Sequence, residues 1–196
     1  MRVKICGITH LQDAQDAIDA GASALGFVFY KPSPRYISAE DAVQIVNALP
    51  PFVQTVGLFV NENEAFINET CLKAKMQLAQ IIDDEGKLDL SQLHCKTIRV
   101  LRAKNKEDIA AIGNEYVLVD AFVESFGGEG KRVALEWFKG VDCSKMVLAG
   151  GLEAQNLKEL RGFNFFGVDV SSGVEQSKGK KDKQKMIDFV KAAHEI

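Results

Sequence analysis

The sequence predicts an α/β fold, a single (β/α)₈ TIM barrel with eight parallel strands, and three observations support this. Short β-branched runs alternate with helical stretches along the whole chain, which gives eight strand-then-helix units. Helices between consecutive strands imply right-handed parallel crossovers. The 196 residues, 46% hydrophobic, suffice for one sizeable core and are too few for two ordinary domains. We therefore expect one domain over residues 1–196.

The predicted strands are short runs rich in β-branched and other apolar residues. They are Val3–Cys6, Ala24–Phe29, Val53–Phe59, Met76–Ile82, Thr97–Leu101, Tyr116–Asp120, Lys145–Ala149 and Phe165–Val170. The competing architecture is an open doubly wound sheet, which eight units do not exclude. No GxGxxG motif follows the first strand, so a dinucleotide-binding form of that sheet has no support.

Helical spacing or composition marks most segments between these strands. Leu11–Ala20 and Ala39–Leu49 are predicted helices, and Ser38 is the expected N-cap of the second. Gly21 and Gly162 lie where helices should end. Further helices are expected at Asn63–Lys73, Lys106–Ile112, Ala134–Lys139, Gln155–Arg161 and Lys181–Ala193, with a weak signal at Leu88–His94.

Charge and composition exclude several classes of function. The net charge of −3 disfavours attraction to nucleic acid or to an anionic membrane surface. No apolar run reaches the roughly 18 residues of a membrane span, and a strand begins at residue 3, where a leader peptide would lie. The four cysteines form no CxxC, which favours reduced thiols in a cytoplasmic protein. No histidine has metal-ligand spacing, so we expect no metal site.

Two side chains at strand ends are candidates for proton transfer. Cys6 ends the first predicted strand and Asp120 ends the sixth. Chemistry on a parallel barrel takes place at the C-terminal ends of its strands, where a thiol and a carboxyl could act as a proton donor and acceptor. Alternatively, Cys6 is a buried small hydrophobic residue and Asp120 is an ordinary cap.

Strand alternation predicts a buried ion pair near the first of these residues. Lys4 shares a face with Cys6, so if Cys6 points inward, Lys4 does too. A lysine inside a barrel must be paired. The eighth strand neighbours the first in a closed barrel, so we expect Lys4 to pair with Asp169, below the active site.

Two segments near the C-terminus resemble a phosphate site. Gly150 and Gly151 follow the seventh strand, and Ser171, Ser172 and Gly173 follow the eighth. Glycines let the backbone approach a dianion, serines donate hydrogen bonds, and barrels often bind phosphate with these two loops. Taken separately, each segment could also be a simple tight turn.

Basic residues provide two further candidates. Arg35 lies in a loop stiffened by two prolines and could reach over the barrel mouth towards an anion, or it could be a solvated arginine. The lysines between Lys178 and Lys185 are interpreted as a solvated helix start that adds positive potential near a phosphate. No aromatic residues interleave with them, which argues against a nucleic-acid surface.

In this order, the motifs closely resemble those of the phosphoribosylanthranilate isomerase family, over nearly the whole chain. The matching segments are Lys4–Thr9, Gly26–Tyr30, Ser33–Ile37, Val56–Asn61, Asp120 with Gly127–Lys131, Ala149–Leu152 and Val168–Glu175. The resemblance implies a (β/α)₈ barrel and a phosphosugar substrate. It also implies a cofactor-free Amadori rearrangement in tryptophan biosynthesis, by a monomer or homodimer.

The same resemblance implies roles for the candidate residues. Cys6 would be the general base and Asp120 the general acid. Arg35 would contact the anthranilate end of the substrate. The phosphate would lie against Gly150–Gly151 and Ser171–Gly173.

The chain departs from the family pattern in two places. The family's Gln-Leu-His-Gly after the fourth strand is here Gln80-Ile81-Ile82-Asp83, and Trp137 comes late after the glycine loop Gly127–Lys131. Two alternatives therefore stay open. One is another phosphosugar barrel of the epimerase kind, although the metal ligands or paired aspartates that it needs are not evident. The other is a non-catalytic phosphosugar-binding barrel.

Overall fold

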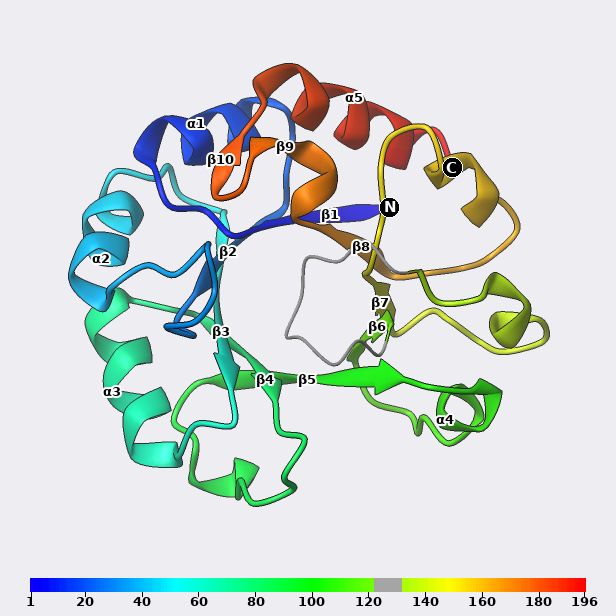
Figure 1. Cartoon of the computed structure of the whole chain (residues 1–196), viewed down its shortest axis with the longest axis horizontal. Helices are drawn as coiled ribbons and strands as arrows, with labels where there is room; N and C mark the ends of the chain where they lie inside the picture. Colours follow the sequence, from blue (N-terminus) through cyan, green and yellow to red (C-terminus); the bar gives the residue numbers. More distant parts are fainter. Residues whose placement is uncertain (122–131) are drawn as a thin grey trace.

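A computed structural model of the chain describes residues 1–121 and 132–196. Within these residues, eight parallel strands pair in chain order to form a closed barrel (Figure 1). The strands are β1 (Arg2–Cys6), β2 (Ala24–Val28), β3 (Gln54–Val60), β4 (Leu78–Ile82), β5 (Lys96–Ala103), β6 (Val117–Ala121), β7 (Met146–Leu148) and β8 (Gly167–Val170). Because β1 pairs with both β2 and β8, the open doubly wound sheet is excluded.

The α-helices lie outside the ring of strands (Figure 1). They are α1 (Leu11–Asp19), α2 (Ala39–Asn47), α3 (Glu64–Ala74), α4 (Lys106–Ala110) and α5 (Lys183–His194). The predicted cap of α2 is confirmed, since Ser38 Oγ accepts a hydrogen bond from the Asp41 N–H at 3.1 Å. Gly21 follows α1 with a φ of 100°, a conformation that favours glycine.

Three segments predicted as helices are shorter and tighter than expected. They form single 3₁₀ turns at Leu90–Gln92, Leu135–Phe138 and Leu157–Leu160. One turn suffices to bring Phe138, Leu157 and Leu160 fully onto the core, so a longer helix is not needed to cover the barrel there. The C-terminal segment also contains an unpredicted hairpin of β9 (Glu175–Ser177) and β10 (Lys180–Lys181), just before α5.

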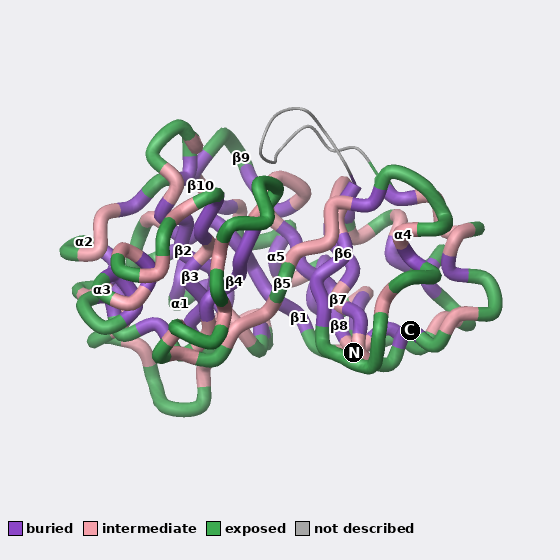
Figure 2. The backbone as a smooth tube through the Cα atoms, turned by 90° about the horizontal axis from the view of Figure 1, so that it is seen from below, coloured by how far each residue is buried: buried purple, intermediate pink, exposed green. Residues whose placement is uncertain are grey.

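Most strands are buried on both faces, as is typical of a parallel barrel, whereas β5 is half-buried or exposed except at Ala103. Figure 2 shows the buried backbone concentrated in the barrel wall and the exposed backbone on the outer helices and loops. Apolar residues such as Ile5, Leu25 and Val168 belong to one continuous core. No helix in the described ranges is long and apolar enough to cross a membrane.

Candidate active site

A pocket of about 120 Å³ opens at the carboxyl ends of the barrel strands. All eight site residues predicted from the sequence line it: Cys6, Arg35, Asp120, Gly150, Gly151, Ser171, Ser172 and Gly173. They come from the end of β1, the loop after β2, the end of β6 and the loops after β7 and β8. The closure of the sheet therefore brings together residues from the two ends of the chain, such as Cys6 and Gly173.

The pocket has two chemically different sides. The side formed by β2 to β6 is lined mainly by apolar residues, Val28, Leu58, Val60, Ile82, Val100 and Leu118, together with the polar side chains of Gln80, Arg102 and Asp120. The opposite side consists of the glycines and serines that follow β7 and β8. One side thus suits an apolar ring, and the other a highly polar group.

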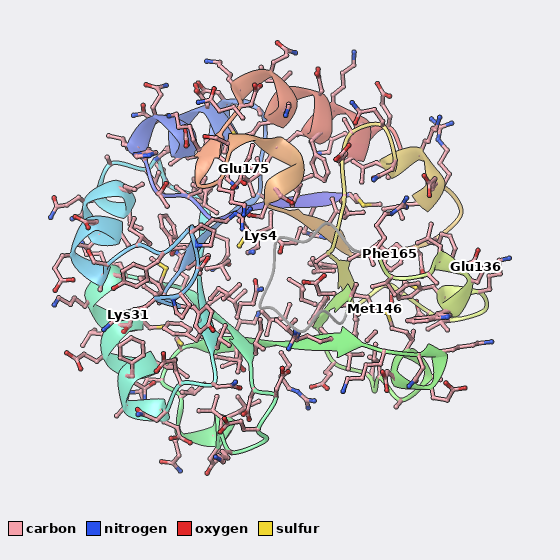
Figure 3. All side chains as sticks on the ribbon, in the orientation of Figure 1. Lys4, Lys31, Glu136, Met146, Phe165 and Glu175 are labelled. Atoms are coloured by element: carbon pink, nitrogen blue, oxygen red, sulfur yellow. The ribbon has the colours of Figure 1, made fainter. Side chains whose placement is uncertain are left out.

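The ion pair predicted between β1 and β8 is confirmed, although Asp169 itself lines the pocket and does not lie below it. Lys4 Nζ lies 2.8 Å from Asp169 Oδ1, both side chains are about 10% exposed, and the two residues are paired in register. Figure 3 shows Lys4 towards the centre of the barrel. Burial alone would lower the pKa of Lys4, but the charges of Asp169 and Cys6 raise it above its ordinary value. The lysine therefore stays charged.

The Cys6 thiol lies directly beside this ammonium group. A Cβ added at Gly26 on β2 would come within 2.8 Å of Cys6 Sγ and 3.0 Å of Lys4 Nζ, so only glycine leaves room for both. Arg35 and Lys181 also interact electrostatically with Cys6. The thiol therefore lies among three basic side chains, those of Lys4, Arg35 and Lys181.

The Asp120 carboxyl has a raised pKa. Burial raises its pKa to about 6, and the nearby charge of Asp169 adds to this. A hydrogen bond of 2.7 Å from the Ala121 N–H to Oδ1 opposes the shift, as do the charges of Arg102 and Lys4. The environment thus makes the protonated carboxyl of Asp120 more available near neutral pH than that of an ordinary aspartate, in the same pocket that holds the Cys6 thiol.

Arg35 is neither solvated nor free to swing over the mouth. It is 7% exposed, and its Nε and Nη2 donate to the two carboxylate oxygens of Glu175 at 2.7 and 2.8 Å. A Cβ at Gly7 would come within 2.6 Å of the Arg35 side chain, so the turn after β1 packs closely against it. The guanidinium is therefore a fixed part of the pocket wall.

The interpretation of the lysine cluster as a solvated helix start is wrong for Lys181. Its side chain is fully buried, and its Nζ donates to Glu175 Oε1 at 3.0 Å and to the Ser171 carbonyl at 3.1 Å. Lys180 pairs with Asp13 on α1, and Lys185 donates to the Glu175 carbonyl. Lys181 and Lys185 therefore tie together parts of the segment that follows β8, and Lys180 ties it to α1. No period or spacing in the sequence separates Lys181 from its exposed neighbours.

The loops after β7 and β8 have backbone geometry that depends on glycine. Gly150 and Gly151 have φ values of 89° and 59°. A Cβ at Gly173 would lie 1.9 Å from the Leu152 carbonyl oxygen, so no other residue fits where the two loops meet. Ser172 begins a 3₁₀ turn that ends at Val174. These contacts hold the two loops together as one surface.

The two departures from the family pattern fall in different surroundings. Gln80 and Ile82 line the pocket, whereas Asp83 accepts hydrogen bonds from the N–H groups of Lys87 and Leu88 and so shapes the loop after β4. Trp137 lies in the 3₁₀ turn after β6 and packs against the core. The loop Gly127–Lys131 lies outside the described residues. The described ranges contain no group of three histidine, cysteine or carboxylate side chains placed to hold a metal ion.

A closed parallel barrel with a thiol and a raised-pKa carboxyl in one pocket defines a (β/α)₈-barrel enzyme suited to acid–base chemistry. Comparison with known proteins then identifies the family. The family model described as N-(5′-phosphoribosyl)anthranilate (PRA) isomerase matches residues 3–192. The chain belongs to this family.

Individual relatives agree with the family match. The N-(5′-phosphoribosyl)anthranilate isomerase of a Nitratiruptor species is 56% identical over 193 residues, covering 98% of each chain. That of a Sulfurovum species is 53% identical over the full length of both. The crystal structure of phosphoribosyl anthranilate isomerase from Thermotoga maritima superposes with a TM-score of 0.88 at 36% identity, covering 100% of both chains.

Proposed function

We propose that this pocket carries out the isomerisation of N-(5′-phosphoribosyl)anthranilate to 1-(2-carboxyphenylamino)-1-deoxyribulose 5-phosphate, a step of tryptophan biosynthesis in the cytoplasm. Family membership supports the reaction. The single observation behind the residue assignment is that one pocket holds the Cys6 thiol beside Lys4 and the Asp120 carboxyl with a pKa of about 6. An aldose-to-ketose rearrangement needs such a pair, with one group initially protonated and the other not.

The two groups act in sequence. Asp120 gives its proton to the furanose ring oxygen, the bond from that oxygen to the anomeric carbon breaks, and an iminium forms at the anthranilate nitrogen. The Cys6 thiolate then removes the proton from the neighbouring sugar carbon, which gives an enolamine. The enolamine relaxes to the ketone. No electrons leave the substrate, so these steps require no redox cofactor.

The two chemically different sides of the pocket support one orientation of the substrate in this proposal. The phosphate lies against Gly150, Gly151, Ser172 and Gly173, where the backbone can approach it closely. The aromatic ring lies against the apolar side formed by β2 to β6. Arg35 contacts the anthranilate carboxylate through Nη1, since its Nε and Nη2 are both engaged by Glu175.

Two solved relatives support parts of this proposal. One is a phosphoribosyl anthranilate isomerase in complex with reduced 1-(o-carboxyphenylamino)-1-deoxyribulose 5-phosphate, 34% identical to this chain with a TM-score of 0.85. Another structure is of monomers generated from the dimeric enzyme of Thermotoga maritima. We propose a phosphosugar ligand for this chain as well, and a monomer or homodimer as its working state.

The direct test is an assay with freshly prepared N-(5′-phosphoribosyl)anthranilate, following the loss of its anthranilate-type fluorescence. The wild-type protein should convert the substrate. Absence of turnover in protein that binds the reduced product would instead favour a non-catalytic phosphosugar-binding barrel.

A further inference from the structure

Gln80 carries a polar atom that the protein itself does not satisfy. The residue is 3% exposed, on β4, and its Oε1 is the buried side-chain oxygen or nitrogen that has no hydrogen-bond partner in the described part of the chain. A buried acceptor without a donor has lost its hydrogen bonds to water and has no protein hydrogen bond in their place, which destabilises the folded state. Such an atom in a folded protein needs an explanation.

The position of Gln80 supplies one. It lines the same pocket as Cys6 and Asp120, and β4 stands opposite β8 in the ring of eight described strands. Its neighbours in the pocket include Leu58, Val60 and Ile82, whose side chains cannot donate hydrogen bonds. The amide is thus a buried polar group set among apolar side chains, in the pocket that Arg102 of β5 and Asp120 of β6 also line.

We propose that Gln80 is a specificity-determining residue, whose side-chain amide binds a sugar hydroxyl of the substrate. This inference rests on the proposed function. The phosphate dianion offers no donor, and the anthranilate N–H lies ortho to its own carboxylate, which can accept from it. The sugar hydroxyls remain. A hydroxyl both donates and accepts, so it can satisfy either end of the amide.

The hydroxyl on the third sugar carbon fits this role best. The second sugar carbon becomes the ketone during the reaction, whereas the third keeps its hydroxyl from substrate to product. A contact to an unchanging group stabilises the ground state and the transition state alike. Its loss should therefore raise KM and leave kcat nearly unchanged.

The neighbouring Gln77 provides a matched control. Its Oε1 accepts hydrogen bonds from the Thr55 N–H and from Gln54 Nε2, both at 3.1 Å, at the start of the barrel strands. Gln77 and Gln80 are close in sequence, but one amide is satisfied by the protein and the other is not. Methionine has nearly the same length as glutamine and cannot accept a strong hydrogen bond, so Gln80→Met and Gln77→Met make the same chemical change, at a buried and at an exposed position.

The experiment compares thermal unfolding of the free protein with steady-state kinetics. We expect Gln80→Met to raise Tm by roughly 2–4 °C, because an unsatisfied buried acceptor is removed, and to lower kcat/KM about 10-fold through KM. Gln77→Met should lower Tm and leave kcat/KM within about twofold of wild type. If Gln80 had only a structural role, its replacement would not raise Tm while weakening substrate binding.

Three results would overturn the role of Gln80. One is wild-type kcat/KM in Gln80→Met; another is a lowered Tm with unchanged kinetics. The third is a fall in kcat at unchanged KM, which would place the contact on a group that changes during the reaction. If wild-type protein fails to turn over N-(5′-phosphoribosyl)anthranilate, the proposed function itself is wrong, and this result is distinct from the other three.

Discussion

Lys4 Nζ and Asp169 Oδ1 lie 2.8 Å apart inside the barrel, close to Cys6 on β1. The pair joins β1 to β8, which are neighbours in the ring but lie at opposite ends of the sequence. It has a structural consequence, because it closes the barrel with a buried charge pair. It also has a chemical one, because it fixes an ammonium group against the thiol that we propose as the base.

Removing one partner of this pair should destabilise the protein strongly. Lys4→Met leaves the Asp169 carboxylate buried without its cation, which typically costs about 3–5 kcal/mol. The double variant Lys4→Met/Asp169→Asn removes both charges and should recover much of that loss. Urea denaturation of the wild type, both single variants and the double variant measures the coupling. Strictly additive losses would show that the pair does not contribute to stability as a unit.

Asp120 should make stability depend on pH. The ordinary pKa of an aspartate side chain is 3.8, and the pKa of Asp120 in the folded protein is about 6. The folded state therefore binds this proton more tightly than the unfolded state does. The resulting stabilisation is present below about pH 4 and is lost as the pH rises through 6. Asp120→Asn should therefore match wild type at pH 4 and exceed it by roughly 1–3 kcal/mol at pH 7. Equal pH dependence in the two proteins would refute the shifted pKa.

The phosphate site can be tested at Gly151. Valine at this position, where φ is 59°, should distort the backbone that we place against the phosphate and raise KM far more than it lowers kcat. Gly140→Val is the control, because Gly140 has a φ of 79° with open space around it and lies outside the pocket. Because both glycines have a positive φ, valine should cost a similar amount of backbone strain at Gly140 and at Gly151. A comparable KM in the two variants would contradict the phosphate assignment.

The features predictable from the sequence were those set by local pattern and by strand alternation. The Lys4–Asp169 pair follows from a period of two residues along β1 and from the closure of the barrel. The eight predicted site residues meet because each lies at the end of a strand or in the loop after it. The strand pattern alone places these residues at the carboxyl end of the barrel, without any knowledge of side-chain contacts.

The features that were missed depend on contacts between distant segments. Arg35 and Glu175 are 140 residues apart, and nothing local distinguishes the buried Lys181 from Lys180 beside it. The unsatisfied amide of Gln80 exists only once all its surroundings are in place. The 3₁₀ turns at Leu135–Phe138 and Leu157–Leu160 were predicted as longer helices, because apolar content marks coverage of the core but not the number of turns.

The central claim is that Cys6 and Asp120 are the base and the acid of one proton-transfer sequence. Cys6→Ser keeps the shape but replaces the thiol with a far weaker acid, and Asp120→Asn cannot deliver a proton. Each should lower kcat by about 10²–10⁴-fold, and the double variant should lose much less than the product of the two. Binding of the reduced product should survive in all three variants.

The most direct measurement is kcat of wild type and of Cys6→Ser at saturating substrate. Our account predicts a fall of at least about 100-fold for Cys6→Ser, with reduced-product affinity within severalfold of wild type. Near-equal kcat values would remove Cys6 from the mechanism and would contradict the account at its centre.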